Sequence, residues 1–503
     1  MNTRLLTMLC ALLLSLTLVN CSNQDESGIE SRSARDTIPL TIKEIDSRIN
    51  KVLDSQTLYN WKRSDDHMIW SAGYHGNFLF TIGFGNSAAD FDRSKFPQHM
   101  QLQNQLLLKI SEMEQRPIAD ILVQSENYLC QIDVIIKKES TVAALRRMAG
   151  IRYIEPADYS FTGLMAQNRS TLSSSSSSGC GYTTAILPIA DYSVTAPNAK
   201  VPWSFTSVQI PQAWNLSSGS GITVGVIDTG VSSEQSLLGS SFADGYSSNR
   251  SISKFGFYVD SIWPWSTTTD GSSDLCGHGT SMVSTISAPR NDNAMPTGVA
   301  YNCNIISCRA ASNVLLDGYH EQNGVKNAFT YLANMASVRI ISMSMGHIIT
   351  VSKIEDAVKY AYSKNKLIFC AAGTSTSYTN FVGVIFPASM TETVAVTGVK
   401  EGIYQACSDC HSGSKVEFTT PMERSVSDNH VPVNSYYNNA SDYIGGSSVA
   451  TATVAGIATL VWARYPTWTR AQVLTRMRSS GNFYPVKHTQ FGYGNINANL
   501  AVQ

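Results

Sequence analysis

The sequence predicts an α/β fold: a doubly wound, mostly parallel sheet with helices on both of its faces. Short apolar segments typical of strands alternate along the chain with longer segments whose apolar residues recur at helical spacing. Such alternation is typical of parallel strands joined by right-handed helical crossovers. A capping-box pattern at 469–472 starts a further helix. The expected strands are 222–228, 304–307, 338–342, 367–370 and 393–396, and the expected helices are 278–288, 325–335 and 354–362.

A smaller α+β domain is expected at 36–165, ahead of that sheet. A linker should follow at 166–198, because this stretch contains the serine run Ser173–Ser178, a natural place for proteolytic nicking. The sheet-containing domain then takes residues 199–503. Within the smaller domain, helical spacing is found at 42–53, 100–113 and 140–148, and strand composition at 78–82, 128–136 and 151–155.

Residues 1–20 have the pattern of a lipoprotein signal peptide. Arg4 precedes an apolar run at 5–19, which is too short to span a bilayer but suits the core of a signal peptide. The run leads into Asn20-Cys21-Ser22, which is similar to a bacterial lipobox, so we expect Cys21 to be acylated and 21–35 to form a polar tether. A plain secretory signal is the alternative. Both place the protein outside the cytoplasm, and the lipid would anchor it in a membrane, at the periplasmic face or the cell surface.

The composition of the chain argues against some classes of function. The chain has a formal net charge of -1 and only 15% charged residues, which argues against a nucleic-acid-binding surface. Hydrophobic residues make up 43% of the 503 residues, so the chain can bury a sizeable core. Beyond the leader, no second long apolar segment predicts another membrane pass.

Three polar residues stand at the ends of predicted elements, where open α/β sheets place their sites. Asp228 ends a strand, His278 falls in the first turn of a helix, and Ser448 follows two glycines at the start of another helix. A serine at a helix start meets free N–H groups and the positive end of the dipole, which favour a nucleophile and its oxyanion. Each residue alone also fits a structural role, as a helix cap, a surface histidine or a Gly-Ser turn. Together they predict a nucleophile, a base and an orienting acid.

The motifs around these residues resemble those of the subtilisin-like serine proteases (subtilases). They are Asp228-Thr229-Gly230, Gly277-His278-Gly279-Thr280 and Gly446-Ser447-Ser448-Val449-Ala450, the last standing where the family has Gly-Thr-Ser-Met-Ala. Their order along the chain is that of subtilisin, and the resemblance covers residues 199–503. It implies a serine endopeptidase that forms an acyl-enzyme on Ser448, with His278 as the base and Asp228 as the orienting acid. Ser447 is the alternative nucleophile.

The strand–helix–strand ending of the domain at 36–165 resembles the inhibitory propeptides of subtilases. This resemblance implies an intramolecular inhibitor that blocks the cleft until it is removed, and an unrelated accessory domain is the alternative. The expected partners are therefore protein or peptide substrates, the chain's own N-terminal domain, and a membrane reached through the lipid anchor. Nucleic acid is not among them.

One position departs from the family pattern. Subtilases carry an asparagine after Ala-Ala-Gly, where its amide helps bind the oxyanion, but here Ala371-Ala372-Gly373 is followed by Thr374. The expected oxyanion donors are therefore the Thr374 hydroxyl and the backbone N–H of Ser448. Two alternatives to an active endopeptidase follow. One is a catalytically weak or inactive protease-fold protein that binds peptides, and the other is a general esterase.

By the same resemblance, the substrate cleft should be edged by Ser344-Met345-Gly346 on one side and Ala371-Ala372-Gly373 on the other. An extended peptide would pair with such an edge by strand addition, and its side chains would enter alternate pockets. Because neither stretch carries a charge, we expect the primary pocket to take an apolar or small side chain.

The cysteines favour disulfides rather than a cofactor. Apart from Cys10 and Cys21, the chain has eight, an even number that fits an oxidising compartment. Cys407 and Cys410 suit a tight loop, and Cys370 suits a buried free thiol. The stretch from Cys407 to His411 also spells the c-type haem attachment pattern, and haem or zinc there is the minor alternative. We expect no cofactor or metal. Calcium is common in the family, but no acidic loop here is specific enough to name its ligands.

Overall fold

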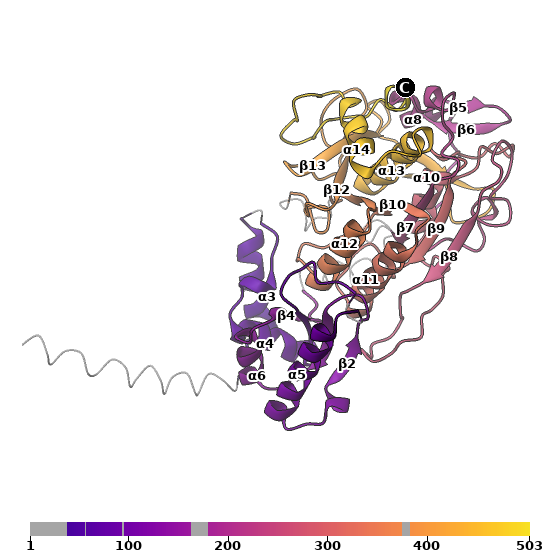
Figure 1. Ribbon diagram of the computed structural model, residues 1–503. Coiled ribbons are helices and arrows are strands. Elements are labelled where there is room, and N and C mark those ends of the chain that lie inside the picture. The colour runs from indigo at the N-terminus through magenta and orange to yellow at the C-terminus, as the bar shows by residue number, and fades with distance from the viewer. Residues whose placement is uncertain (1–37, 56, 93–94, 162–179, 375–382) are drawn as a thin grey trace, which may run out of the picture.

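The computed structural model describes residues 38–55, 57–92, 95–161, 180–374 and 383–503, which form two domains packed against each other (Figure 1). The predicted signal peptide, the acylation site Cys21, the polar tether and the serine run lie outside the described residues.

The larger domain is built on a seven-stranded sheet with the strand order β13-β12-β11-β10-β7-β9-β8. Every neighbouring pair in it is parallel. The chain first adds strands on one side of β7 and then crosses to the other side, so the winding reverses between β7 and β10. The predicted doubly wound parallel sheet is confirmed. Its strands are β7 (Thr223–Asp228), β8 (Ile252–Gly256), β9 (Asn304–Arg309), β10 (Val338–Met343), β11 (Leu367–Ala371), β12 (Val394–Lys400) and β13 (Val416–Glu423).

Helices cover both faces of this sheet. Helices α11 (Tyr319–Asn334) and α12 (Ser352–Ser363) pack on one face, and α10 (His278–Ser287) and α13 (Gly446–Arg464) on the other (Figure 1). Successive strand residues divide between the two apolar layers, as expected for a parallel sheet buried on both faces. Within the described residues, α13 is the one helix that is long and apolar enough to cross a membrane. However, 94% of its apolar stretch is buried inside the protein. It is therefore the central core helix of the domain.

Shorter elements complete the larger domain. They are η4 (Ile189–Asp191), β5 (Tyr192–Thr195), β6 (Ala199–Pro202), α8 (Trp203–Ser207), α9 (Ile210–Ala213), η5 (Ser236–Leu238), β14 (Val431–Asn434), β15 (Ser441–Ile444), α14 (Arg470–Ser479) and α15 (Ala498–Val502). Helix α14 begins at the predicted capping box, in which Thr469 and Gln472 exchange side-chain and backbone hydrogen bonds. The end of the expected linker is folded, because η4 and β5 fall within it.

The N-terminal domain is a four-stranded antiparallel sheet, in the order β2-β3-β1-β4, covered by helices. This confirms the predicted smaller α+β domain. Helix α4 escaped prediction because Met68 to Gly73 are all buried, so its apolar residues show no clear helical period. The elements are α3 (Ile42–Leu53), η1 (Trp61–Arg63), α4 (Asp66–His75), β1 (Leu79–Phe84), α5 (Pro97–Glu114), η3 (Ile118–Asp120), β2 (Leu122–Ser125), β3 (Gln131–Ile135), α6 (Glu139–Arg146) and β4 (Ile151–Pro156).

Candidate active site

Asp228 and His278 meet at the carboxyl edge of the sheet. Asp228 is the last residue of β7, and His278 is the first residue of α10. The two are 1% and 4% exposed, and His278 Nδ1 lies 2.7 Å from Asp228 Oδ1. Burial alone lowers the pKa of His278, but the charge and hydrogen bond of Asp228 raise it on balance above its ordinary value. With Asp228 ionised, Nδ1–H donates to the carboxylate and Nε2 is left as the proton acceptor.

A second buried carboxylate, Asp274, holds the loop that leads into α10. It accepts the N–H groups of Cys276 and Gly277, each at 2.8 Å, and that of Thr280 at 2.9 Å. It thereby caps the first turn of α10 on both sides of His278. Its charge also contributes to the raised pKa of His278. Sequence reasoning missed this residue, because Asp274 stands three residues before the N-cap Gly277 and not at the N-cap, where a capping aspartate is expected.

Ser448 lies in the first turn of α13, where backbone N–H groups have no partner within the helix. Gly446, at φ +79°, makes the sharp entry into that helix. The Ser448 hydroxyl donates to the backbone carbonyl of Ser344 at 3.4 Å, and the Ser344 hydroxyl donates to the carbonyl of Ser448 at 3.0 Å. In the described part of the chain no hydrogen bond joins Ser448 to His278, but both line the same cavity.

This cavity has a volume of about 510 Å³. Of the residues expected to edge the cleft, Ser344, Met345, Gly346, Ala371 and Gly373 line it. Ala372 does not, and its placement in the cleft was wrong. Side chains alternate across an extended strand, so Ala372 points the other way and is buried in the apolar layer of α11 and α12. The residues of the wall that sequence reasoning missed include Cys180, Thr183, Val314, Leu315, His347, Ile348, Ile385, Asp409, His430, Asp442 and Tyr443.

Thr374 also lines the cavity, beside the first turn of α13. Its Oγ1 lies 3.1 Å from the hydroxyl oxygen of Ser447, which accepts the N–H of Gly373 at 3.2 Å. A Cβ placed on Gly446 would come within 2.9 Å of Thr374 Oγ1, so the small residue there makes room for the hydroxyl. Ser447 itself is fully buried and held by these contacts. This arrangement favours Ser448 over Ser447 as the nucleophile.

Two disulfides lie beside the cavity. Cys180–Cys276 ties the residues after the serine run to the loop before His278, and Cys407–Cys410 closes the tight loop that the spacing predicts. The same two cysteines stand in the haem attachment pattern. In the described residues the free cysteines are Cys130, Cys303, Cys308 and Cys370, all buried. No group of three or more His, Cys, Asp or Glu side chains in the same residues is arranged to hold a metal ion.

Comparison with known proteins shows which family the chain resembles. The family model of the subtilase family matches residues 219–494. Thermitase from Thermoactinomyces vulgaris is 26% identical over 296 residues, which cover 59% of this chain and 94% of thermitase. Alkaline elastase YaB from Bacillus sp. (strain YaB) is 28% identical over 307 residues, which cover 60% of this chain and 70% of that protein. A crystal structure of MycP1 with its N-terminal propeptide removed matches 60% of this chain and 98% of its own, at 20% identity and a TM-score of 0.47. Since the family model covers more than half of the sequence, the chain belongs to the subtilase family.

Proposed function

We propose that this chain is an extracytoplasmic serine endopeptidase that hydrolyses peptide bonds through an acyl-enzyme on Ser448. The observation that carries the proposal is the 2.7 Å contact between His278 and Asp228 in a cavity that also holds Ser448. A buried carboxylate on Nδ1 fixes the tautomer in which Nε2 can accept a proton. Membership of the subtilase family supports the same chemistry.

In the proposed reaction the Ser448 hydroxyl leaves its bond to the Ser344 carbonyl and gives its proton to His278 Nε2 as Oγ attacks the scissile carbonyl. The Ser448 N–H and the Thr374 hydroxyl stabilise the oxyanion. Asp228 remains ionised and stabilises the imidazolium. His278 then protonates the leaving amine, and water, activated by the same histidine, hydrolyses the ester on Ser448.

The peptide is proposed to lie along Ser344-Met345-Gly346 and to pair with this edge by strand addition. Met345, Ile348 and Ile385 contribute apolar side chains to the cavity, which supports a preference for an apolar or small primary side chain. The two acidic side chains on the wall, Asp409 and Asp442, favour a basic group elsewhere along the peptide.

We further propose that the enzyme is made as a lipoprotein anchored through Cys21, and that its N-terminal domain inhibits it until the connecting chain is cut. The lipobox-like sequence supports the anchor. The disulfides Cys180–Cys276 and Cys407–Cys410 support an oxidising, extracytoplasmic compartment. The contact between the two domains supports an inhibitor that folds against the protease (Figure 1).

A fluorophosphonate probe tests the central proposal, because it reacts only with a serine activated by a base. Labelling of the cut protein that is lost in the variant Ser448→Ala is the expected result. If the cut protein is folded but does not react with the probe, the result would instead indicate a protease-fold protein that binds peptides without cleaving them. This second candidate is favoured by Thr374, which stands where the family has an asparagine. Comparing casein with small ester substrates separates a peptidase from an esterase.

Because the pKa of His278 is raised, we expect activity to be lost at a higher pH on the acid side of the pH profile than with an ordinary histidine. The neutral imidazole is the catalytic base, so activity is lost as the pH falls through the pKa of His278 in the free enzyme. Since Asp228 raises that pKa above 6.5, the midpoint of the acid limb of kcat/KM should lie above pH 6.5. A pH profile of kcat/KM with a peptide substrate measures it. A midpoint clearly below that value would contradict the ion pair between His278 and Asp228.

The hydroxyl of Thr374 is expected to contribute to kcat by stabilising the oxyanion. Thr374→Val removes the hydroxyl and keeps the shape, and it should lower kcat by about 100-fold with little change in KM, a size taken from loss of the asparagine donor in subtilisin. Thr374→Asn restores the family's donor and serves as the matched control, with kcat retained. Steady-state kinetics on one peptide compare the three proteins. An unchanged kcat in Thr374→Val would assign the oxyanion to other donors.

A further inference from the structure

The apolar core of the N-terminal domain continues into the wall of the candidate active site. Ile348 and Ile349 of the larger domain are 2% and 3% exposed, and they belong to the same buried cluster as Tyr59 and Trp61 of the N-terminal domain. Ile385 packs against this cluster as well. Because Ile348 and Ile385 also line the cavity, the N-terminal domain supports the same side chains that face a bound peptide.

The backbone makes the same connection. The N–H of Tyr59 donates to the carbonyl of Ile348 at 3.3 Å, and the N–H of Thr350 donates to the carbonyl of Tyr59 at 2.8 Å. The segment held in this way follows directly on the cleft residues Ser344–Gly346. The cavity wall at 344–350 is therefore fixed at its far end by a strand-like contact from the other domain.

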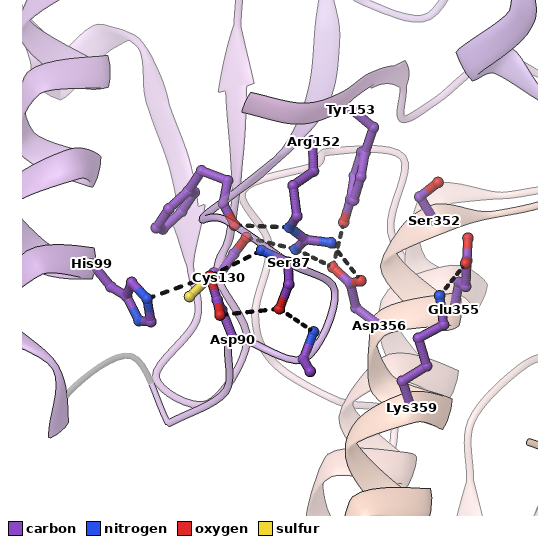
Figure 2. Close-up of polar contacts among 12 residues, drawn as sticks. Ser87, Asp90, His99, Cys130, Arg152, Tyr153, Ser352, Glu355, Asp356 and Lys359 are labelled. Carbon is purple, nitrogen blue, oxygen red and sulfur yellow. Dashed lines mark hydrogen bonds and ion pairs between the residues drawn. The ribbon is translucent and has the colours of Figure 1, made fainter. Parts of the chain in front are cut away.

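Charged and polar contacts anchor the docked domain on α12. Figure 2 shows Arg152 and Tyr153, both from β4, converging on Asp356. The Arg152 guanidinium donates to both carboxylate oxygens, at 2.9 and 2.7 Å, and the Tyr153 hydroxyl donates to one of them at 2.9 Å. At the start of α12, the N–H of Ser352 donates to Glu155 at 2.9 Å. A bidentate pair such as Arg152–Asp356 is geometrically specific as well as strong.

Two lysines of the larger domain depend on the N-terminal domain for their counter-charges. The Lys326 and Lys353 side chains are both 2% exposed. Their carboxylate partners are Glu126 for Lys326 and Asp133, at 3.2 Å, for Lys353. Lysines are almost never buried so completely without a paired charge. Loss of the N-terminal domain would therefore uncover an apolar patch at 348–349 and remove the counter-charges of these two lysines.

From these contacts we propose that the N-terminal domain is a permanent part of the substrate cleft: it stays docked after the connecting chain is cut and holds the wall at 344–350 in place for peptide binding. The inference rests on the proposed peptidase function and deepens it. Cutting the chain relieves inhibition, while the docked domain remains necessary for cleavage of peptides. The cut enzyme is then a tight complex of two pieces.

The first test cuts the whole protein at a specific protease site that replaces part of the run Ser173–Ser178. We expect the two pieces to co-elute in size-exclusion chromatography, and the complex to cleave a peptide at least as fast as the uncut chain. Pieces that separate, with the larger one alone cleaving the peptide at undiminished kcat/KM, would overturn the proposal.

The second test weakens the support without cutting the chain. Tyr59→Ala removes a side chain from the shared cluster, and kcat/KM on an extended peptide should fall on the order of tenfold, since small misplacements of a substrate-positioning element cost up to ~100-fold. Labelling of Ser448 by the small fluorophosphonate should stay within about twofold, because the reagent does not need the wall.

Leu145→Ala is the matched control. Leu145 is fully buried in the same apolar cluster, but it comes from α6, which packs on α4, α5 and β4. It should lower the melting temperature while leaving peptide kcat/KM unchanged. Normal labelling together with unchanged peptide kcat/KM in Tyr59→Ala would refute the role in the cleft. Absence of labelling in the parent protein would instead refute the peptidase function itself.

Discussion

Replacing Ser448 with alanine is expected to lower kcat by about 10⁶-fold, the size of the effect in subtilisin, a member of the same family. The variant keeps the fold, because alanine suits the first turn of α13 and the weak 3.4 Å hydrogen bond from Ser448 to the Ser344 carbonyl is the side-chain contact it loses. Peptide binding should persist, since the cavity wall is unchanged. Steady-state kinetics give kcat, and a labelled peptide gives Kd.

Ser447→Ala is the control for this prediction. Ser447 is fully buried and contacts Gly373 and Thr374, so its loss should lower kcat far less than the loss of Ser448. The opposite ranking, with Ser448→Ala active and Ser447→Ala inactive, would assign the nucleophile to Ser447.

Asp228→Asn is expected to lower kcat by about 10⁴-fold, as in other enzymes with this constellation. The asparagine has nearly the same shape, but its amide can donate to Nδ1 and hold His278 in the tautomer that leaves no base at Nε2. Loss of the carboxylate should also lower the pKa of His278, since Asp228 contributes more than Asp274 to raising it. A pH profile of the residual activity measures both effects.

The variant Asp274→Asn tests whether capping of α10 contributes to catalysis separately from the orientation of His278 by Asp228. Asp274 accepts hydrogen bonds from the loop and first turn around His278, but His278 bonds to Asp228. We therefore expect a lower melting temperature and a smaller loss of kcat than in Asp228→Asn. Equal losses in the two variants, or a loss below about tenfold in Asp228→Asn, would contradict the role given to Asp228.

The sequence was most informative where function depends on local pattern. Asp228, His278 and Ser448 each end or begin a regular element, so a strand or helix assignment also places the residue at the sheet edge. The parallel sheet followed from the alternation of strand and helix patterns, which both faces of the sheet require. The cleft residue Ala372 was misplaced because the stretch was treated as a unit, without the two-residue alternation of an extended chain.

Contacts between distant segments could not be predicted in this way. The pairing of Cys180 with Cys276 spans 96 residues, and the bridge between Tyr59 and Ile349 joins two domains. Neither the disulfide nor the bridge produces a periodic pattern in the sequence, because each depends on how whole helices and strands pack together. Helix α4 was missed for a related reason, because it is buried on several sides and lacks a polar face to mark its period.

Trapping the acyl-enzyme tests most directly whether Asp228, His278 and Ser448 act as one catalytic unit. The cut protein is mixed with an activated peptide ester, quenched in acid within the first turnover, and its peptides are analysed by mass. We predict a burst of the released alcohol and one acyl group on Ser448, both abolished in Ser448→Ala and strongly slowed in Asp228→Asn. Release of product without a covalent adduct, or an adduct on any other residue, would contradict the account.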